Sequence, residues 1–275
     1  MQSTLPPLRT RFAPSPTGFL HKGHALSALW AARRAEQLGG AFLVRVEDID
    51  HTRRRPEMIQ DIYNVLDWLG LEPDGEIVHQ HDRRALYDDA LRALQQLGVI
   101  YPCTCTRTDI LAVTGDPNAP YPGTCRGNVT DHAAPVAWRI DLQSLPNTII
   151  TWQDLTAGEQ KDDLTVWGDV IVARRDIGTS YHLAHVVDDA LQGITHVTRG
   201  HDLFTQTPIH RMLQDLLGLP QPIYDHHPLL MDHHHGARKL SKRDGSTSLM
   251  ALAAAGMSRH DLLQELTPIL DQLKR

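Results

Sequence analysis

The sequence predicts an α/β protein in which a parallel sheet is covered by helices. Segments with a strand-like apolar pattern alternate with segments of helical periodicity, and glycines follow the helical ones. The 275 residues can bury a substantial core and suit one large domain, or one and a half. Apolar residues make up 41% of the chain and charged residues 22%, as in ordinary globular proteins.

The N-terminal third carries the clearest alternation. We expect strands at Leu8–Ala13 and Ala41–Asp48, and helices at His24–Leu38, Glu57–Leu69 and Asp82–Leu97. Glycine stands directly after each of these helices. The strand–helix–strand–helix order favours a parallel sheet, because two parallel strands need a long crossover that is usually a helix.

The middle of the chain changes character. Residues 102–135 are rich in Cys, Pro, Gly, Thr and Asn, show little periodicity, and resemble an inserted loop module. Beyond it we expect strands at 136–140, 169–175 and 194–200, helices at 181–191 and 208–217, and two short helices after Ser246. The predicted divisions are the first half of the main domain at 8–101, the insert at 102–135, the second half at 136–236, and a short helical C-terminal region at 237–275.

Charge and composition exclude several classes of protein. A net charge of −6 argues against indiscriminate nucleic-acid binding, although arginines cluster at 33–34, 53–55, 83–84 and 174–175. No apolar run approaches a membrane span, and the N-terminus lacks the apolar segment of a secretory signal. We expect a cytoplasmic monomer without a membrane partner.

The tetrapeptide His-Lys-Gly-His at 21–24 lies where the first strand passes into the first helix. A helix N-terminus offers unpaired N–H groups and partial positive charge, which suit a phosphate. Gly23 lets a ligand approach the backbone, and His21 and His24 can donate hydrogen bonds to phosphate oxygens. The alternative is a turn in which the two histidines have no role in binding a ligand.

A second short motif, Lys-Leu-Ser-Lys at 239–242, follows the last predicted strand. Alone it indicates an exposed loop. Lysine ammonium groups in a mobile loop also suit a polyphosphate leaving group. An early H-x-G-H and a late K-x-S-K on an α/β pattern are together far more specific than either motif alone.

These two motifs together resemble the class I aminoacyl-tRNA synthetases. The segments RFAPSPTG, VRVEDIDHTR, RRDIGTSYHLAHVVDDALQGITHVTRGHDL and KLSKRDG resemble the glutamyl-tRNA synthetase group in particular, over about residues 9 to 250. The resemblance implies a Rossmann-like doubly wound parallel sheet as the catalytic core. Two departures are Lys22, where an apolar residue is usual, and Leu240 in place of Met.

The resemblance also implies an amino-acid pocket. Arg11 would bind the side-chain carboxylate of L-glutamate, Glu47 its ammonium group, and Tyr181 and Arg199 would close the pocket, to which Ala13 and Ser15 contribute. A planar, permanently charged guanidinium suits a carboxylate and penalises a neutral amide. Alone, Glu47 would be a surface ion pair or a helix-start carboxylate, and Tyr181 or Arg199 would be structural.

The implied reaction is attack of the glutamate α-carboxylate on the α-phosphorus of ATP, which gives glutamyl-adenylate and pyrophosphate. His21, Gly23, His24 and Lys242 would bind ATP. The two histidines would stabilise the five-coordinate phosphorus, and the lysines Lys239 and Lys242 the departing pyrophosphate. Mg²⁺ would bridge the phosphates, held mostly by ATP itself.

Three cysteines, Cys103, Cys105 and Cys125, lie in the insert. The odd count disfavours a disulfide framework, and their spacing indicates a structural zinc site that needs a fourth ligand. His132 and Asp116 are chemically natural candidates. The resemblance favours Tyr121, since small glutamyl-synthetase relatives carry C-x-C…Y-x-x-x-C. The alternative is that two or three of the cysteines are free thiols in a loop.

The histidine-rich segment 225–236 also suggests a metal, but we interpret it as a solvated loop. His227 there follows a strand, and His233 to His235 precede the lysine motif.

The acceptor of the activated glutamate is inferred from the resemblance and from length. Only 32 residues follow Arg243, which we expect to be too few for a domain that reads an anticodon (275 − 243). The shortened form with the zinc pattern resembles glutamyl-Q tRNA(Asp) synthetases, which transfer glutamate onto queuosine at the wobble position of tRNA(Asp). The partner would then be the anticodon arm.

Three other functions stay open at this point. The chain could aminoacylate tRNA with glutamate, with its anticodon reader on a separate chain. It could be a small-molecule ligase or nucleotidyltransferase, since H-x-G-H sites serve those enzymes too. It could also be a non-catalytic, zinc-containing RNA-binding module, although that function does not require the intact histidines and lysines of the two phosphate motifs.

Overall fold

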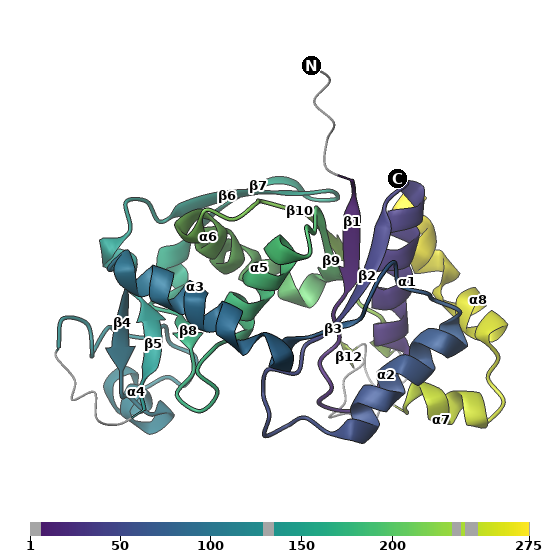
Figure 1. Ribbon diagram of the computed structural model, residues 1–275, viewed down its shortest axis with the longest axis horizontal. Coiled ribbons are helices and arrows are strands. Elements are labelled where there is room, and N and C mark those ends of the chain that lie inside the picture. Colours follow the sequence, from purple (N-terminus) through teal and green to yellow (C-terminus); the bar gives the residue numbers. More distant parts are fainter. Residues whose placement is uncertain (1–6, 129–134, 233–237, 240–246, 275) are drawn as a thin grey trace, which may run out of the picture.

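A parallel sheet whose strand order reverses in the middle forms the centre of the molecule. In the computed structural model, which describes residues 7–128, 135–232, 238–239 and 247–274 (Figure 1), β1 (Arg9–Phe12), β2 (Ala41–Val46) and β3 (Val78–His79) pair in that order. On the other side of β1, β9 (His196–Gly200) pairs in parallel with β10 (Ile223–His227). The backbone N–H of Thr195 donates to the carbonyl of Arg9 at 3.1 Å and joins the two halves. The order β3-β2-β1-β9-β10 is that of a doubly wound sheet.

Helices cover both faces because side chains alternate along each strand. On one face, the Thr10 hydroxyl donates to the carbonyl of Ala31 in α1 (Lys22–Gln37). On the other, Arg11 pairs with Asp189 in α5 (Tyr181–Leu191). The core on the α1 face also contains residues from α2 (Pro56–Leu69), α7 (Leu249–Ala254) and α8 (Arg259–Leu270). The core on the α5 face contains residues from α3 (Arg84–Gln96) and α6 (Thr207–Leu217).

The predicted helices and strands are found within a few residues of their expected ends. One correction concerns α1, which begins at Lys22 rather than His24, because His21 caps it. Another concerns 80–83, which form a 3₁₀ turn, η1 (Gln80–Arg83), before α3. The two short C-terminal helices are α7 and α8.

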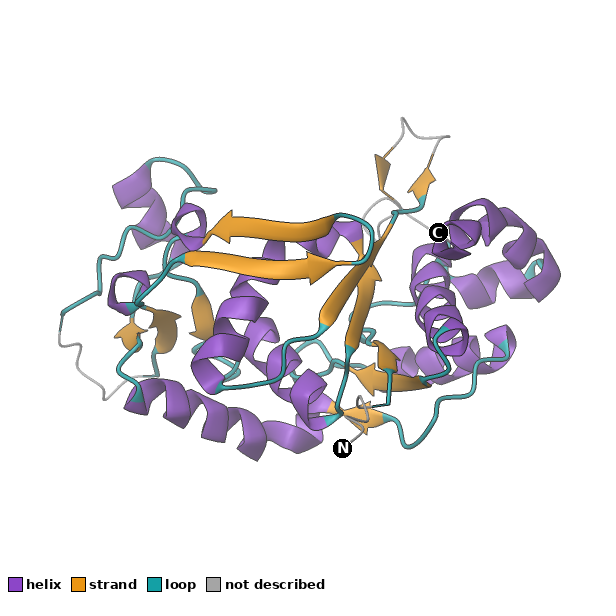
Figure 2. Ribbon diagram, turned by 90° about the horizontal axis from the view of Figure 1, so that it is seen from above, coloured by secondary structure: helices purple, strands orange, loops and turns teal. Residues whose placement is uncertain are grey.

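The sequence did not predict a hairpin beside β10. β6 (Ile149–Asp154) joins β10 in parallel and pairs antiparallel with β7 (Gly158–Asp163). The two strands are the long antiparallel arrows in Figure 2. All six residues of β7 are glycine or polar, so the strand has no apolar alternation to detect.

The predicted insert is more ordered than a loop module. β4 (Ile100–Cys103) pairs with β5 (Ala137–Ile140), and β5 pairs with β8 (Ile171–Ala173). The predicted boundary at 102 therefore falls inside β4. The insert also contains α4 (Arg107–Thr114), where Thr106 and Asp109 form a capping box.

The expectation of a solvated loop at 225–236 is wrong for its first part. Asp225, His226 and His227 belong to β10 and are buried between helices on both faces. After them, β11 (Met231–Asp232) pairs antiparallel with β12 (Arg238–Lys239). His233, His234 and His235 lie outside the described residues. Among the residues that the structure describes, no helix is both long and apolar enough to cross a membrane.

Candidate active site

A cavity of about 480 Å³ opens at the carboxyl ends of β1 and β9, where the strand order of the sheet reverses. Ligands of doubly wound proteins bind at this kind of place. Nine residues singled out in the sequence line this one cavity: Arg11, Ala13, Ser15, His21, Gly23, His24, Glu47, Tyr181 and Arg199. They come from β1, the start of α1, the end of β2, the start of α5 and β9.

The two histidines of the H-x-G-H motif cap α1 reciprocally. Nδ1 of His21 accepts the N–H of Gly23 at 3.1 Å, and Nδ1 of His24 accepts the N–H of His21 at 3.1 Å. Their ring centroids are 3.9 Å apart. A Cβ on residue 23 would come within 2.9 Å of Cε1 of His21, so a larger residue there would push the His21 ring out of this position. The motif therefore holds both imidazoles at the positive end of the helix.

The three lysines of the two phosphate motifs lie in different parts of the chain. Nζ of Lys22 is 2.5 Å from a carboxylate oxygen of Glu265 in α8, and Lys22 is not among the residues that line the cavity. The unusual Lys22 therefore ties α1 to α8. Lys239 ends β12, whereas Lys242 lies outside the described residues, so its role stays a prediction.

Arg11 is already paired inside the protein. Its Nε donates to Asp189 at 3.0 Å, one terminal nitrogen donates to the carbonyl of Thr198 at 2.8 Å, and the other lies 3.3 Å from Nε2 of His185. The side chain is 2% exposed. Asp189 thus holds the guanidinium at the base of the cavity.

Asp189 also balances a second buried arginine. Arg45 donates to Asp189 at 2.7 Å and to Glu47 at 3.2 Å. Burial alone would raise the pKa of Asp189, but the positive charge of Arg11, the contact with His185 and the positive charge of Arg45 hold it well below its usual range. Burial opposes ionisation of Glu47 too, and His185 and Arg45 outweigh it and lower the pKa of Glu47. Both carboxylates therefore carry charge.

Arg199 has a different environment, since its partners are neutral. It donates to Nε2 of His226 at 2.9 Å and to the hydroxyl of Thr207 at 2.7 Å, and its third nitrogen lies 2.9 Å from Nδ1 of His210. Burial lowers the pKa of His226 to about 4 and lowers that of His210 well below the usual value, so both rings are uncharged at neutral pH. Within the described part of the chain, no carboxylate forms an ion pair with Arg199, although the residue is 5% exposed.

Sequence reasoning missed His185, which also lines the cavity. Tyr181, His185 and Asp189 are spaced four apart on α5 and therefore share one helix face. Nδ1 of His185 is buried without a hydrogen-bond partner, 3.6 Å from Glu47. Spacing from the predicted Tyr181 was the signal that could have identified it.

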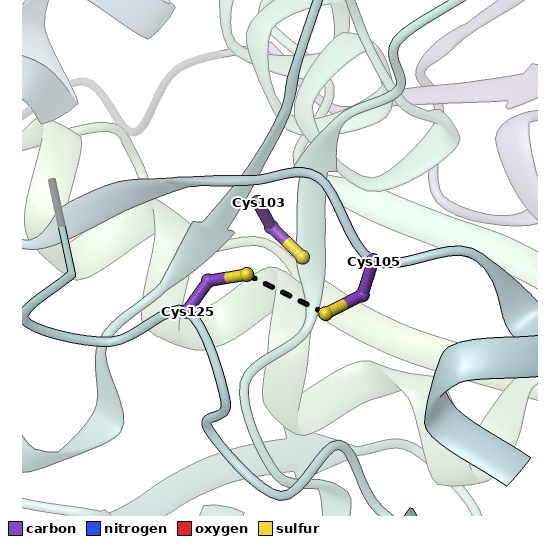
Figure 3. Close-up of side chains that lie close together, drawn as sticks. All are labelled: Cys103, Cys105 and Cys125. Carbon is purple, nitrogen blue, oxygen red and sulfur yellow. Dashed lines mark hydrogen bonds between the residues drawn. The ribbon is translucent and has the colours of Figure 1, made fainter. Parts of the chain in front are cut away.

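The three cysteines gather at the end of β4 (Figure 3). Their sulfur atoms lie within 4.8 Å of one another, and those of Cys105 and Cys125 are 3.4 Å apart. The Tyr121 hydroxyl lies 3.3 Å from the sulfurs of both Cys103 and Cys105. Three cysteine sulfurs are typical zinc ligands, and the phenol oxygen lies where a fourth donor would stand, while burial raises the pKa of Tyr121 and opposes the deprotonation that such a ligand needs.

The neighbours of this cluster favour Tyr121 over the other predicted fourth ligands. Asp116 instead accepts the N–H of Asn118 at 2.8 Å, and His132 lies outside the described residues. Burial would raise the pKa of Cys125, but hydrogen bonds from Tyr121 and the Thr104 backbone help lower it to about 6. Cys125 can therefore be a thiolate near neutral pH, whereas burial raises the pKa of Cys105 to about 11, so a metal would have to displace the Cys105 proton.

The arginine clusters are partly neutralised by acidic residues. At least one member of each forms an ion pair: Arg34 with Asp225, Arg54 with Asp48, Arg83 with Asp188, and Arg174 with Asp50. These four arginines serve the fold, and phosphate contacts from the clusters stay a prediction.

Known proteins share both the sequence and this fold. Residues 7–269 match the family described as tRNA synthetases class I (E and Q), catalytic domain. A glutamyl-Q tRNA(Asp) synthetase of Rhodobacter capsulatus is 44% identical over 92% of this chain and 97% of that protein. One of Geobacter sulfurreducens is 41% identical over 90% and 79%.

A solved structure has a similar fold. The glutamate tRNA ligase of Elizabethkingia meningosepticum, in complex with its amino acid, is 28% identical with a TM-score of 0.75 over 87% of this chain, which spans 53% of that protein. The family match covers most of the chain, and the two relatives are matched over most of their length at 41–44% identity. The chain belongs to the class I tRNA synthetases of the glutamate and glutamine type, and among them to the glutamyl-Q tRNA(Asp) synthetases.

Proposed function

We propose that this chain activates L-glutamate with ATP and transfers it onto queuosine in the anticodon arm of tRNA(Asp). The observation that carries the activation step is that one cavity is lined both by Arg199, which has no carboxylate partner among the described residues, and by the histidine-capped start of α1. The residues that would bind the amino acid and those that would bind the phosphates therefore line the same cavity.

The charges in the pocket select an amino acid with a carboxylate side chain. The side-chain carboxylate of glutamate would be the anion that pairs with Arg199, whose partners in the protein are neutral. Arg11 is the second guanidinium in the pocket. Glutamine would leave Arg199 as a buried cation without an anion, which costs several kcal/mol. Ionised Glu47 binds the substrate ammonium, Tyr181 closes the pocket, and Ala13 and Ser15 form its wall.

The start of α1 handles the phosphates of ATP. The α-carboxylate attacks the α-phosphorus, and the bond from that phosphorus to the α,β-bridging oxygen breaks to release pyrophosphate. His21 and His24 stabilise the charge that builds up on the five-coordinate phosphorus, and Gly23 lets the phosphate reach the backbone N–H groups. Lys239 and Lys242 would hold the departing pyrophosphate. Mg²⁺, bound mainly by ATP, neutralises phosphate charge.

The acceptor follows from the relatives' names rather than from the cavity. Both relatives described above are named for transfer to tRNA(Asp), and queuosine is the acceptor that their family name denotes. The three free cysteines agree with a reducing, cytoplasmic compartment, where tRNA and ATP are found.

The zinc ion is proposed as a structural part of the insert. Cys103, Cys105, Tyr121 and Cys125 would hold it, since their donor atoms already lie together. The ion would cross-link a segment whose own core consists of few residues. It takes no part in the chemistry of adenylation.

ATP–pyrophosphate exchange without tRNA tests the activation step. The wild-type chain should support exchange with glutamate, and much less with glutamine or aspartate. Exchange with glutamine but not with glutamate would overturn the pocket assignment. Absence of exchange with any amino acid, in a chain that binds ATP, would mean that activation requires tRNA or does not occur.

A further inference from the structure

A second cluster of metal-binding side chains lies outside the cavity, at the ends of β2 and β3. Asp48 follows β2, His79 ends β3, and His81 lies in η1. Oδ2 of Asp48 is 3.4 Å from Nδ1 of His79 and 2.8 Å from Nδ1 of His81. One donor atom from each residue lies within 4.8 Å of the others.

The outward nitrogens of both rings have partners of their own. Nε2 of His79 shares a hydrogen bond of 2.7 Å with the Tyr63 hydroxyl in α2, and Nε2 of His81 is 2.9 Å from a carboxylate oxygen of Asp82. Histidines that bind metals almost always have such a partner on the second nitrogen, which fixes the ring orientation. Both rings therefore present Nδ1 to the same carboxylate.

The carboxylate is also held in place. Asp48 is 2% exposed, and its other oxygen accepts the backbone N–H of His81 at 3.0 Å. The cation now nearest to it is Arg54, whose Nε is 3.2 Å from Oδ2 without meeting the geometry of a hydrogen bond. The Arg54 side chain is 37% exposed and can move into solvent.

We infer that Asp48, His79 and His81 form a site for a divalent transition metal, with zinc the best fit. Two imidazoles and one carboxylate are typical zinc ligands, and ligand atoms around tetrahedral zinc are about 3.3 Å apart. Water would complete the coordination, and the metal would displace Arg54. Bound zinc would tie β3 and η1 to the strand end that carries Glu47. This site is separate from the cysteine cluster and does not depend on the proposed reaction.

Equilibrium dialysis of the chelator-stripped full chain against zinc chloride tests this site. His81→Gln should bind one equivalent less than the wild-type chain, or bind it at least about a hundredfold more weakly. His260→Gln is the matched control, because His260 is an exposed histidine on α8. Equal zinc binding by His81→Gln and the wild-type chain would overturn the site.

Two further variants leave all three ligands in place, so that a folding defect in His81→Gln cannot obscure the result. Tyr63→Phe removes the partner of His79 and should weaken zinc binding about tenfold. Arg54→Gln removes the competing cation and should strengthen it several-fold. A site in which Asp48 only balances Arg54 would show no change in zinc affinity in either variant, and that result would contradict the proposal.

Discussion

Arg11 and Arg199 line the same cavity but differ in what balances their charge. Arg11 is paired with Asp189, whereas Arg199 contacts neutral histidines and a hydroxyl. The sequence assigned both to one pocket but gave no basis for distinguishing them. The distinction comes from α5 and β10, which supply the partners from distant parts of the chain.

Substituting the two arginines should therefore give different results. Arg199→Gln should lower glutamate-dependent exchange at least about a hundredfold, because one charged contact to the substrate is worth about 3 kcal/mol. It should cost little stability, since no buried ion pair is broken. Arg11→Ala should lower exchange as well, and should also destabilise the fold by about 3 kcal/mol, because Asp189 loses a buried partner.

Exchange kinetics and urea denaturation of both variants check this pair of predictions, with ATP binding as the control for an intact phosphate site. Unchanged exchange kinetics in Arg11→Ala would refute its role in binding glutamate. Equal destabilisation by both substitutions would contradict the difference in charge balance.

Buried histidines should make stability depend on pH. Burial outweighs the hydrogen bond with Asp154 and lowers the pKa of His226 to about 4, against about 6.5 in an unfolded chain. Between these values the unfolded chain binds more protons than the folded one, so the free energy of unfolding falls as the pH falls. From pH 8 to pH 5 this histidine should account for about 2 kcal/mol.

Urea denaturation across that range measures the effect, and His226→Gln should reduce the change by about 2 kcal/mol, while His210 and His182 still contribute to the rest. Carboxylates with a lowered pKa, such as Glu47, lose their contribution only below about pH 4.5, outside this window. The same pH dependence in wild type and variant would show that His226 is not responsible.

At the scale of elements, the start of α1 combines a structural and a catalytic task in one residue. His21→Ala should lower the exchange rate about a hundredfold and cost about 1 kcal/mol through loss of the cap. His21→Asn should keep the cap but not the rate, because an amide can accept from the helix yet cannot replace an imidazole at the phosphorus.

Lys22→Ala is the matched control for this prediction. It removes only the ion pair with Glu265, so the exchange rate should stay within about twofold and stability within about 1 kcal/mol. Thermal denaturation and exchange assays separate the two tasks. A rate in His21→Asn equal to that of the wild type would show that the histidine only caps the helix.

The cysteine cluster belongs to the insert, and its metal should stabilise that element alone. Cys125→Ser should lose most bound zinc and increase proteolysis within 102–128, while glutamate-dependent exchange changes only a few-fold. Tyr121→Phe should weaken zinc binding about tenfold, and Asp116→Ala should leave it unchanged. Metal analysis that finds no zinc in the wild-type chain would refute the site.

A helix or strand could be predicted from the sequence where its own residues carry the pattern that specifies it. The periodicity of α2 and α5 and their capping residues specify them without help from the rest of the chain. β7 forms because β6 offers it an edge, and its polar sequence carries no sign of this. α4 has a recognisable capping pair, but it is short and has no buried residue to set an apolar period.

At the scale of the whole molecule, the alternation of elements predicted an α/β fold but not the order of its strands. β1 and β9 are separated by more than half the chain, and the cavity in which the site lies opens where these two strands lie side by side. Only the resemblance of whole segments to a known family indicated this arrangement. The site residues were predictable for the same reason, whereas the contacts that Asp189 and His185 make with Arg11 required the packing of α5 on the sheet.

The most direct test of the account is transfer of labelled glutamate by the full chain to tRNA(Asp), prepared with queuosine or with unmodified guanosine at the wobble position. The account predicts label on the queuosine-containing tRNA alone, in the fragment that contains the anticodon after ribonuclease digestion. Label at the 3′ end, or equal labelling of both tRNAs, would contradict it and indicate ordinary aminoacylation.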